Sequence, residues 1–289
     1  MKSDPLISCL CITKYRTRFL KRAIDCFLHQ SYLNKELIIV YPEEDKETEF
    51  FIMANQHPLI RSVKVKDTSK KSLGRLRNMS IDTADGEFFC VWDDDDWYHK
   101  DRLQFQMNAI RLHKKEACGL AFWLMYDAVK NDAYFSTPMI LPGSILCAKS
   151  VINEQVCYGD INRGEDLEFS SLLTGRNYLC PLIMPSLYIY VYNGNNTWDK
   201  GHFNRLFSPF LRLSVEAGEL IGNVLSSKYD QDESSDLMLS QQLLQEFNFF
   251  HLQMPVRYKL VCFAEPSLSG LLVIEITSHI ITYIVVLTS

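Results

Sequence analysis

Short apolar runs alternate with amphipathic helical patterns through the first half of the chain, and this alternation restricts the fold more than any other feature. Apolar runs of strand length cover residues 6–12, 36–41, 62–65, 87–92 and 120–126. Apolar side chains at helical spacing cover residues 19–28, 75–83 and 103–110. Strands and helices that alternate in this way form a mostly parallel sheet, whose ligands bind at the carboxyl ends of the strands. The sequence therefore predicts an α/β domain with its site at that edge.

The second half of the chain has a less regular pattern. It predicts strands at residues 141–148 and 182–192, a helix at residues 164–175, and mainly helices from residue 203 to about 252, interrupted at Pro209. In the first half, the acidic segment at residues 43–49 follows Pro42 and is expected to be a loop.

The most apolar segment lies at the end of the sequence, at residues 268–289, and is long enough to span a bilayer. On a helix, however, Glu275, Ser278, His279 and Thr282 would form one polar stripe. A helix that lies on a membrane, or that packs on the protein or a partner, fits this stripe better than a span. The many β-branched residues also allow a pair of strands.

Composition limits the class of protein. Of the 289 residues, 47% are hydrophobic and 22% charged, which excludes general disorder. The 30 Lys and Arg against 35 Asp and Glu give a formal net charge of −5, which argues against a nucleic-acid-coating protein. The 9 cysteines include no CxxC pair, so a disulfide scaffold and a structural zinc site are not expected. We expect a cytoplasmic protein, because the apolar start precedes its basic cluster, the wrong order for a secretory signal.

Four consecutive carboxylates, Asp93 to Asp96, follow the predicted strand at residues 87–92. Like charges this close are costly without a cation or hydrogen-bond donors. On extended backbone, Asp93 and Asp95 would point one way and the other two the opposite way. Mg²⁺ and Mn²⁺ prefer oxygen ligands and often share one or two carboxylates with substrate phosphates. The run therefore suits a metal–diphosphate site, although a solvated loop before the next helix is an alternative. An EF-hand loop is excluded by spacing.

Several short motifs flank this run. Thr13-Lys14-Tyr15 ends the first predicted strand, and Gln30-Ser31-Tyr32 ends the following helix. Further along come Gly74, Arg77-Asn78, Gly86-Glu87-Phe88, the run from Trp92 to Trp97, and Asp101-Arg102-Leu103. In this order and spacing, residues 6–110, and more weakly the chain up to residue 200, resemble the family 2 glycosyltransferases of the GT-A fold.

The resemblance implies a GT-A fold, a Rossmann-like nucleotide-binding fold with a mostly parallel central sheet, over residues 1–200. Residues 1–98 would form the donor half and residues 99–200 the acceptor half. A C-terminal helical extension at residues 201–254 and the apolar tail at residues 255–289 would follow.

The resemblance also implies Mn²⁺ or Mg²⁺ and a nucleoside diphosphate sugar, most often a UDP-sugar. Asp95 would bind the metal, while Asp93 and Asp94 would hold the ribose, the uracil or the hydration shell of the metal, with Asp93 as a second metal ligand. Thr13 would line the base pocket. The family's acid after the second strand is displaced here, so Glu43 or Glu44 can only be proposed as its substitute.

A second acidic site, Gly164-Glu165-Asp166, begins a predicted helix. Acidic residues at the start of a helix also interact favourably with the helix dipole, so the pair could stabilise the helix without a further function. By the resemblance, Asp166 would be the base that takes the proton from the acceptor hydroxyl, and Glu165 would support it.

Two further segments have candidate residues. By the resemblance, His202, in the polar segment at residues 193–203, would be a third metal ligand or a diphosphate contact, and the alternative is a surface turn. In the basic stretch at residues 61–77, we expect Arg75 and Arg77 to add charge at the donor diphosphate. The other basic side chains are expected in solvent, and a contact with anionic lipid is the alternative.

These features predict a metal-dependent inverting glycosyltransferase of bacterial surface-polysaccharide or glycolipid synthesis. Its partners would be a nucleotide-sugar donor and a saccharide or lipid-linked acceptor, with no nucleic acid and with a peripheral contact to the inner membrane face as an option. A sugar nucleotidyltransferase is a competing class, but residues 13–19 contain no glycine for a phosphate loop. A non-catalytic nucleotide- or carbohydrate-binding module is the other.

Overall fold

The computed structural model describes residues 4–198, 200–240 and 243, and the backbone of residues 260–264, 271–276 and 281–286. The chain forms two compact units. Unit 1 comprises Met1–Cys118 and Pro142–Leu179, and unit 2 comprises Gly119–Leu141 and Cys180–Ser289. The predicted boundaries at residues 98, 200 and 254 stay predictions.

Unit 1 is built on a mostly parallel sheet. Its parallel strands, β1 (Ile7–Ile12), β2 (Lys35–Pro42), β3 (Ile60–Val65) and β4 (Phe88–Val91), lie in the order β4-β1-β2-β3. Ile7 pairs with Lys35 on one side and with Phe88 on the other. β9 (Leu146–Ala148) extends the sheet antiparallel to β4, and β6 (Ala117–Leu120) pairs with β9. The predicted parallel α/β sheet is confirmed.

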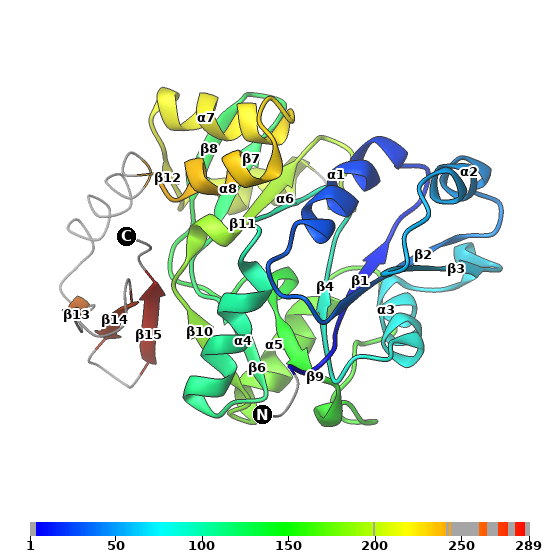
Figure 1. Cartoon of the computed structure of the whole chain (residues 1–289), viewed down its shortest axis with the longest axis horizontal. Helices are drawn as coiled ribbons and strands as arrows, with labels where there is room; N and C mark the ends of the chain where they lie inside the picture. Colours follow the sequence, from blue (N-terminus) through cyan, green and yellow to red (C-terminus); the bar gives the residue numbers. More distant parts are fainter. Residues whose placement is uncertain are drawn as a thin grey trace. The chain divides into compact units, whose positions relative to one another are not determined.

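The α-helices in the described part of unit 1 are α1 (Thr17–Leu28), α2 (Lys46–Ala54), α3 (Leu73–Thr83), α4 (Arg102–His113) and α5 (Glu165–Gly175). α1 and α2 lie on one side of β1 and β2, and α3 lies on the other (Figure 1). Right-handed crossovers require this arrangement, because the chain moves outward from β1 to β3 and then returns to β4. Shorter elements are η1 (Thr68–Lys70), β5 (Trp97–Tyr98), η2 (Pro142–Ser144) and η3 (Lys149–Val151).

Helix α2 corrects the prediction of a loop at residues 43–49. The Asp45 carboxylate accepts a hydrogen bond from the Thr48 backbone N–H at 3.0 Å, so Asp45 caps the helix that begins at Lys46. Glu47 and Glu49 in its first turn also suit the positive end of a helix dipole. The acidic residues therefore favour a helix start here.

Unit 2 contains a smaller sheet. Its strands β7 (Leu124–Asp127), β8 (Asp132–Phe135), β11 (Tyr188–Tyr192) and β12 (Leu211–Arg212) lie in the order β12-β8-β7-β11. The single strand predicted at residues 120–126 is wrong, because β6 ends at Leu120 and β7 begins at Leu124 in a different sheet. The strand predicted at residues 182–192 is likewise divided into β10 (Leu179–Leu182), η4 (Pro185–Leu187) and β11.

Over residues 200–240, the predicted C-terminal helices are present as α6 (Lys200–Phe207), α7 (Val215–Leu225) and α8 (Gln231–Met238), whereas the remainder of the predicted helical range, up to residue 252, lies largely outside the described residues. Beyond them, β13 (Leu260–Ala264), β14 (Leu271–Ile276) and β15 (Ile281–Val286) form an antiparallel sheet. The helix preferred for residues 268–289 is therefore wrong over these strands, and the alternative of paired strands is the one that forms. Within the described part of the chain, no helix has the length and apolar character needed to cross a membrane.

Gly74 lets α3 approach the chain before α5. A Cβ atom at this position would lie 1.8 Å from the Gly159 carbonyl oxygen. We expect Gly74→Ala to lower the free energy of unfolding by about 1–3 kcal/mol, because the helix must move away from a backbone atom. Urea unfolding measures this loss. Gly175→Ala is the matched control, since a Cβ there meets nothing within 4 Å. An equal effect of both substitutions would contradict the prediction.

Candidate active site

The acidic run lies at the carboxyl end of β4, on a loop that aromatic side chains hold in place. The buried Trp92 donates from Nε1 to the Ala23 carbonyl oxygen at 2.9 Å and stacks on Tyr98, with 3.9 Å between ring centroids. The Tyr98 hydroxyl donates to the Asp93 carbonyl oxygen at 3.0 Å. The buried Arg102 guanidinium lies 4.7 Å from the Tyr98 ring centroid. Both ends of the run are therefore fixed by packing.

Hydrogen bonds from the Gln30-Ser31-Tyr32 motif also hold the segment that follows the acidic run. The Gln30 side chain donates to the His99 carbonyl oxygen at 2.7 Å and accepts from the Leu103 N–H at 3.1 Å. The Ser31 N–H donates to the Lys100 carbonyl oxygen at 2.8 Å. These bonds join the end of α1 to the start of α4, so the motif positions the loop.

Three of the four residues of the run are buried and Asp93 is half-buried, which contradicts the alternative of a solvated loop. Asp94, Asp95 and Asp96 are 2%, 7% and 0% exposed. The predicted alternation of side chains is wrong, because Asp94 and Asp95 lie in a turn. Both of their carboxylates consequently reach one cation: Arg16 Nη1 lies 3.3 Å from Asp94 Oδ1 and 3.1 Å from Asp95 Oδ2.

Thr13 and Asp94 meet as the parallel strands predict. Thr13 Oγ1 donates to Asp94 Oδ2 at 2.5 Å. Burial raises the pKa of Asp94 to about 7, and the neighbouring Asp95 adds to this, whereas Thr13 and Arg16 oppose it. Sequence reasoning missed Arg16. Its position directly after the turn that ends β1 could have indicated it, because this end of β1 lies beside the end of β4.

Arg77 of α3 joins the acidic run to the second acidic site. Its Nε donates to Glu165 Oε1 at 3.1 Å, and its Nη1 lies 3.5 Å from Asp93 Oδ1. The guanidinium is buried and lies 5.8 Å from the Tyr158 ring centroid. Burial alone would lower the pKa of Arg77, but Asp93, Tyr158 and Glu165 outweigh it and raise the pKa. The guanidinium therefore stays charged between the two acids.

The neighbouring residues of α3 hold the chain that leads into α5. Asn78 makes two hydrogen bonds with the backbone of Tyr158, at 2.8 and 3.0 Å. The Leu73 N–H donates to Asn162 Oδ1 at 3.0 Å, and the Gly74 N–H donates to the Ile161 carbonyl oxygen at 3.1 Å. The Arg77-Asn78 motif thus fixes the start of α5 relative to β4.

Glu165 and Asp166 are the first two residues of α5, after Gly164 with a φ of 82°. Glu165 is buried and Asp166 half-buried. The Leu167 N–H donates to Asp166 Oδ1 at 2.9 Å. Burial raises the pKa of both carboxyl groups, and Arg77 opposes this rise. A carboxylate with a raised pKa is a better proton acceptor near neutral pH.

The acidic residues after β2 differ in solvent exposure. Glu43 is exposed, and its Oε1 lies 3.9 Å from Lys66 Nζ, while Glu44 is also exposed. Asp45, which sequence reasoning missed, is fully buried and accepts from the Tyr15 N–H at 2.5 Å. It therefore fixes the turn next to Thr13. The role of Glu43 as a base contact stays a prediction.

The remaining site predictions concern Arg75 and His202. Arg75 is exposed on α3. His202 belongs to α6 in unit 2 and stacks on Trp198, with 4.2 Å between ring centroids. Among the residues that the structure describes, no three His, Cys, Asp or Glu side chains are grouped to hold a metal. A Mg²⁺ site needs only one or two carboxylates when waters and substrate phosphates complete it. Asp95, which is buried, and Asp93, which is half-buried, offer carboxylate oxygens for such a site, and the metal roles of Asp93, Asp95 and His202 stay predictions.

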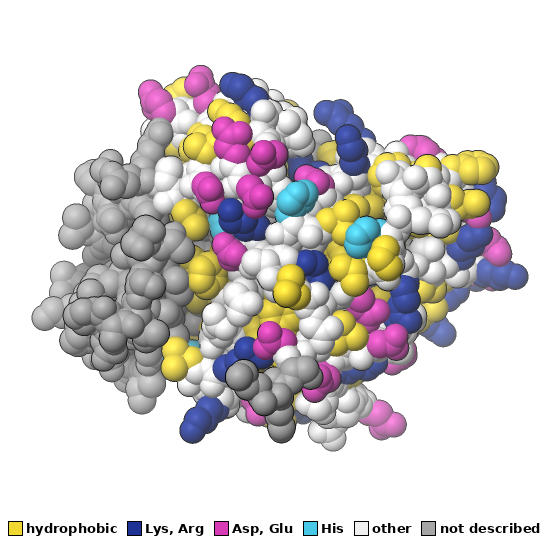
Figure 2. All heavy atoms as spheres, viewed as in Figure 1, with side chains coloured by type: hydrophobic (Ala, Val, Ile, Leu, Met, Phe, Trp, Pro, Cys, Tyr) yellow, Lys and Arg dark blue, Asp and Glu magenta, His cyan; other side chains and the backbone are white. Residues whose placement is uncertain are grey.

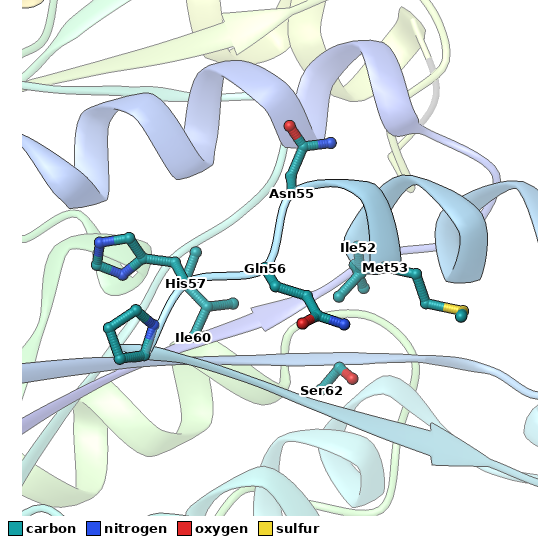
Figure 3. A pocket seen from close by; sticks show the side chains of 8 residues that line it. Ile52, Met53, Asn55, Gln56, His57, Ile60 and Ser62 are labelled. Atoms are coloured by element: carbon teal, nitrogen blue, oxygen red, sulfur yellow. The ribbon is translucent and has the colours of Figure 1, made fainter.

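A cavity of about 440 Å³ lies elsewhere in unit 1, between the end of α2 and β3. Side chains such as Asn55, His57 and Ser62 line it (Figure 3). It lies near the amino end of β3, whereas the acidic run follows the carboxyl end of β4, so it contains no predicted site residue. Nearby, hydrophobic side chains gather over α2 (Figure 2), where Phe50 and Met53 are 68% and 59% exposed.

The model of the glycosyl transferase family 2 matches residues 8–139, a range that contains Thr13, Arg77 and the acidic run. The predicted resemblance to that family is confirmed over these residues, which make up less than half of the chain.

Two named relatives support the same class. WcaA of Escherichia coli (strain K12), whose name places it among the glycosyl transferases of colanic acid biosynthesis, is 31% identical over 163 residues, which are 55% of this chain and 54% of WcaA. The amylovoran biosynthesis glycosyltransferase AmsB of Erwinia amylovora is 28% identical over 145 residues, 48% of this chain and 46% of AmsB. The chain therefore spans about half the length of these curated relatives.

Solved structures share the fold. S. aureus TarS 1–349 in complex with UDP-GlcNAc has a TM-score of 0.55 at 14% identity, covering 87% of this chain and 76% of TarS 1–349. The mannosyltransferase PcManGT of Pyrobaculum calidifontis, in complex with GDP-Man and Mn²⁺, has a TM-score of 0.50 at 12% identity, covering 87% of this chain and 80% of PcManGT. At these identities the likeness concerns the fold alone. The predicted GT-A fold is confirmed.

Proposed function

We propose that this protein is a metal-dependent inverting glycosyltransferase. It would move a sugar from a nucleoside diphosphate sugar to a hydroxyl group of a saccharide or lipid-linked acceptor. A UDP-sugar is the expected donor. The observation that supports this most is the Arg77 bridge, which brings Asp93 and Glu165 into one site although they lie far apart in sequence. The names of WcaA and AmsB favour bacterial surface-polysaccharide or glycolipid synthesis.

Asp166 is the base in this proposal. The Leu167 N–H holds Oδ1, so the carboxylate has a fixed orientation at the start of α5. Its other oxygen can take the proton from the acceptor hydroxyl as that oxygen attacks the anomeric carbon from the face opposite the leaving diphosphate. Glu165 is held by Arg77 and supports this arrangement rather than taking the proton.

Asp95 and Asp93 would hold Mn²⁺ or Mg²⁺, which when bound neutralises charge on the departing diphosphate. Thr13 and Asp94 would face the nucleoside, and their hydrogen bond fixes the Asp94 carboxylate for that contact. The TarS and PcManGT complexes hold a nucleotide sugar, and PcManGT also holds Mn²⁺, which supports both requirements. Contacts of Glu43 with the base, of Arg75 with the diphosphate, and of His202 with the metal are the remaining parts of the proposal.

The pH dependence of the rate tests the base. Asp166 must be ionised to accept a proton, and burial raises its pKa above the ordinary value. The rate should therefore fall as the pH is lowered, beginning above the range of an ordinary aspartate, which is about 4. Measurement of kcat from pH 4 to 9 at saturating donor and Mn²⁺ checks this. A rate that stays constant down to pH 4 would contradict it.

The proposed function is tested with a panel of nucleotide sugars and candidate acceptors, with and without Mn²⁺ or Mg²⁺, scored by nucleoside diphosphate release and by product mass. We expect release to require the metal and Asp95→Ala to lower it at least about a hundredfold, because a metal contributes several kcal/mol of charge stabilisation. Asp82→Ala, at an exposed carboxylate of α3, should retain the wild-type rate.

Equal release by the Asp95→Ala variant and the wild type would exclude Asp95 as the metal ligand. UDP binding without turnover on any donor and acceptor would instead favour the non-catalytic binding module. Formation of a nucleotide sugar from a sugar phosphate and a nucleoside triphosphate would identify a nucleotidyltransferase.

A further inference from the structure

Arg16 is a basic side chain in the acidic site to which sequence reasoning gave no role. It is the residue directly before α1, and its side chain makes no capping hydrogen bond to that helix. Instead, Nη1 contacts Asp94 Oδ1 and Asp95 Oδ2. One guanidinium nitrogen thus lies against both the proposed metal ligand and its neighbour.

The local backbone directs Arg16 to this place. Tyr15 has a φ of 53°, a left-handed conformation that is uncommon for residues with a side chain. The buried Asp45 holds this turn, because its carboxylate accepts from the Tyr15 N–H. The position of Arg16 is therefore built into the turn between β1 and α1.

An arginine within α1 has a different role. Arg22 donates from Nε to the Asp96 carbonyl oxygen at 3.2 Å and from Nη2 to the Asp95 carbonyl oxygen. It holds the backbone of the run, whereas Arg16 neutralises the carboxylates. The side chain of Arg16 is also 28% exposed against 10% for the side chain of Asp95, so it can leave toward solvent without opening the core.

We propose that Arg16 is the resident counter-ion of the metal site, which a divalent ion displaces from Asp95, and that the released guanidinium then binds the diphosphate of the donor. This inference rests on the proposed function for its metal and donor. A divalent ion approaches a carboxylate oxygen to about 2.1 Å, and the Arg16 nitrogen lies 3.1 Å from the same oxygen. Two cations at one oxygen repel each other, and a partly exposed ion pair is weak enough to be displaced.

Mn²⁺ binding to the nucleotide-free full chain tests the competition, with free Mn²⁺ followed by electron paramagnetic resonance at pH 8. We expect Arg16→Gln to bind Mn²⁺ about fivefold more tightly than the wild type. Arg16→Lys, which keeps the charge, should stay within about twofold. Arg18→Gln, at an exposed arginine in the first turn of α1, is the matched control and should also remain close to the wild type. Circular dichroism verifies that each variant is folded.

UDP binding at saturating Mn²⁺, measured by calorimetry, tests the second step. Here Arg16→Gln should bind UDP about tenfold more weakly, because a charge-assisted contact with the diphosphate is lost. Unchanged or weaker Mn²⁺ binding by Arg16→Gln, or an equal gain in Arg18→Gln, would overturn the competition. Unchanged UDP binding would overturn the proposal that the Arg16 guanidinium binds the diphosphate. Neither measurement needs sugar transfer. If Arg16→Gln binds Mn²⁺ more tightly but the wild type transfers no sugar, the result would contradict the proposed function and not the competition.

Discussion

Asp166→Asn is expected to lower kcat about 10²- to 10⁴-fold, since the amide has almost the same shape but cannot accept the proton of the acceptor hydroxyl. Binding of UDP with Mn²⁺ should stay within about twofold of the wild type, because Asp166 is proposed to act on the acceptor hydroxyl and not to hold the nucleotide or the metal. Initial rates of transfer and calorimetry with UDP measure the two effects separately.

Glu168→Gln is the control for this prediction. Glu168 is an exposed acid in the same first turn of α5, so its loss changes the local charge equally without removing the proposed base. Its rate should stay close to that of the wild type. A kcat of Asp166→Asn within threefold of the wild type would exclude Asp166 as the base.

The second large effect is expected at Arg77. Arg77→Met removes the partner of Glu165, a carboxylate that is only 3% exposed, and also the cation beside Asp93. Loss of one member of a buried ion pair typically costs about 3–5 kcal/mol of the free energy of unfolding, because the other charge stays buried without compensation. Urea unfolding at pH 7 measures this loss.

Arg75→Met provides the matched comparison, since Arg75 lies on the same helix but is exposed. Its effect should stay within about 0.5 kcal/mol. The double variant Arg77→Met with Glu165→Gln should regain part of the stability, because the buried charge is then removed as well. A loss at Arg77 as small as that at Arg75 would contradict the proposed bridge.

The site predictions differ in how far local sequence could support them. The aspartate run and the Glu165-Asp166 pair are visible because adjacent acids form an unusual pattern. The role of Arg77 at the donor diphosphate stays a prediction, and only the structure reveals that its guanidinium contacts Glu165 and Asp93. Asp45 was hidden among neighbouring acids, and burial alone distinguishes it from the exposed Glu43.

The sequence by itself determined the central parallel strands, most helices and the family, because apolar periodicity and motif order are local properties that one chain displays directly. Only the tertiary structure decided which cation faces which acid. Arg16 reaches Asp95 because β1 and β4 are neighbours in the sheet, and Arg77 reaches Glu165 because Gly74 lets α3 approach the chain before α5. Such pairings depend on strand order and close packing, and residues so far apart in sequence carry no local signal of their contact.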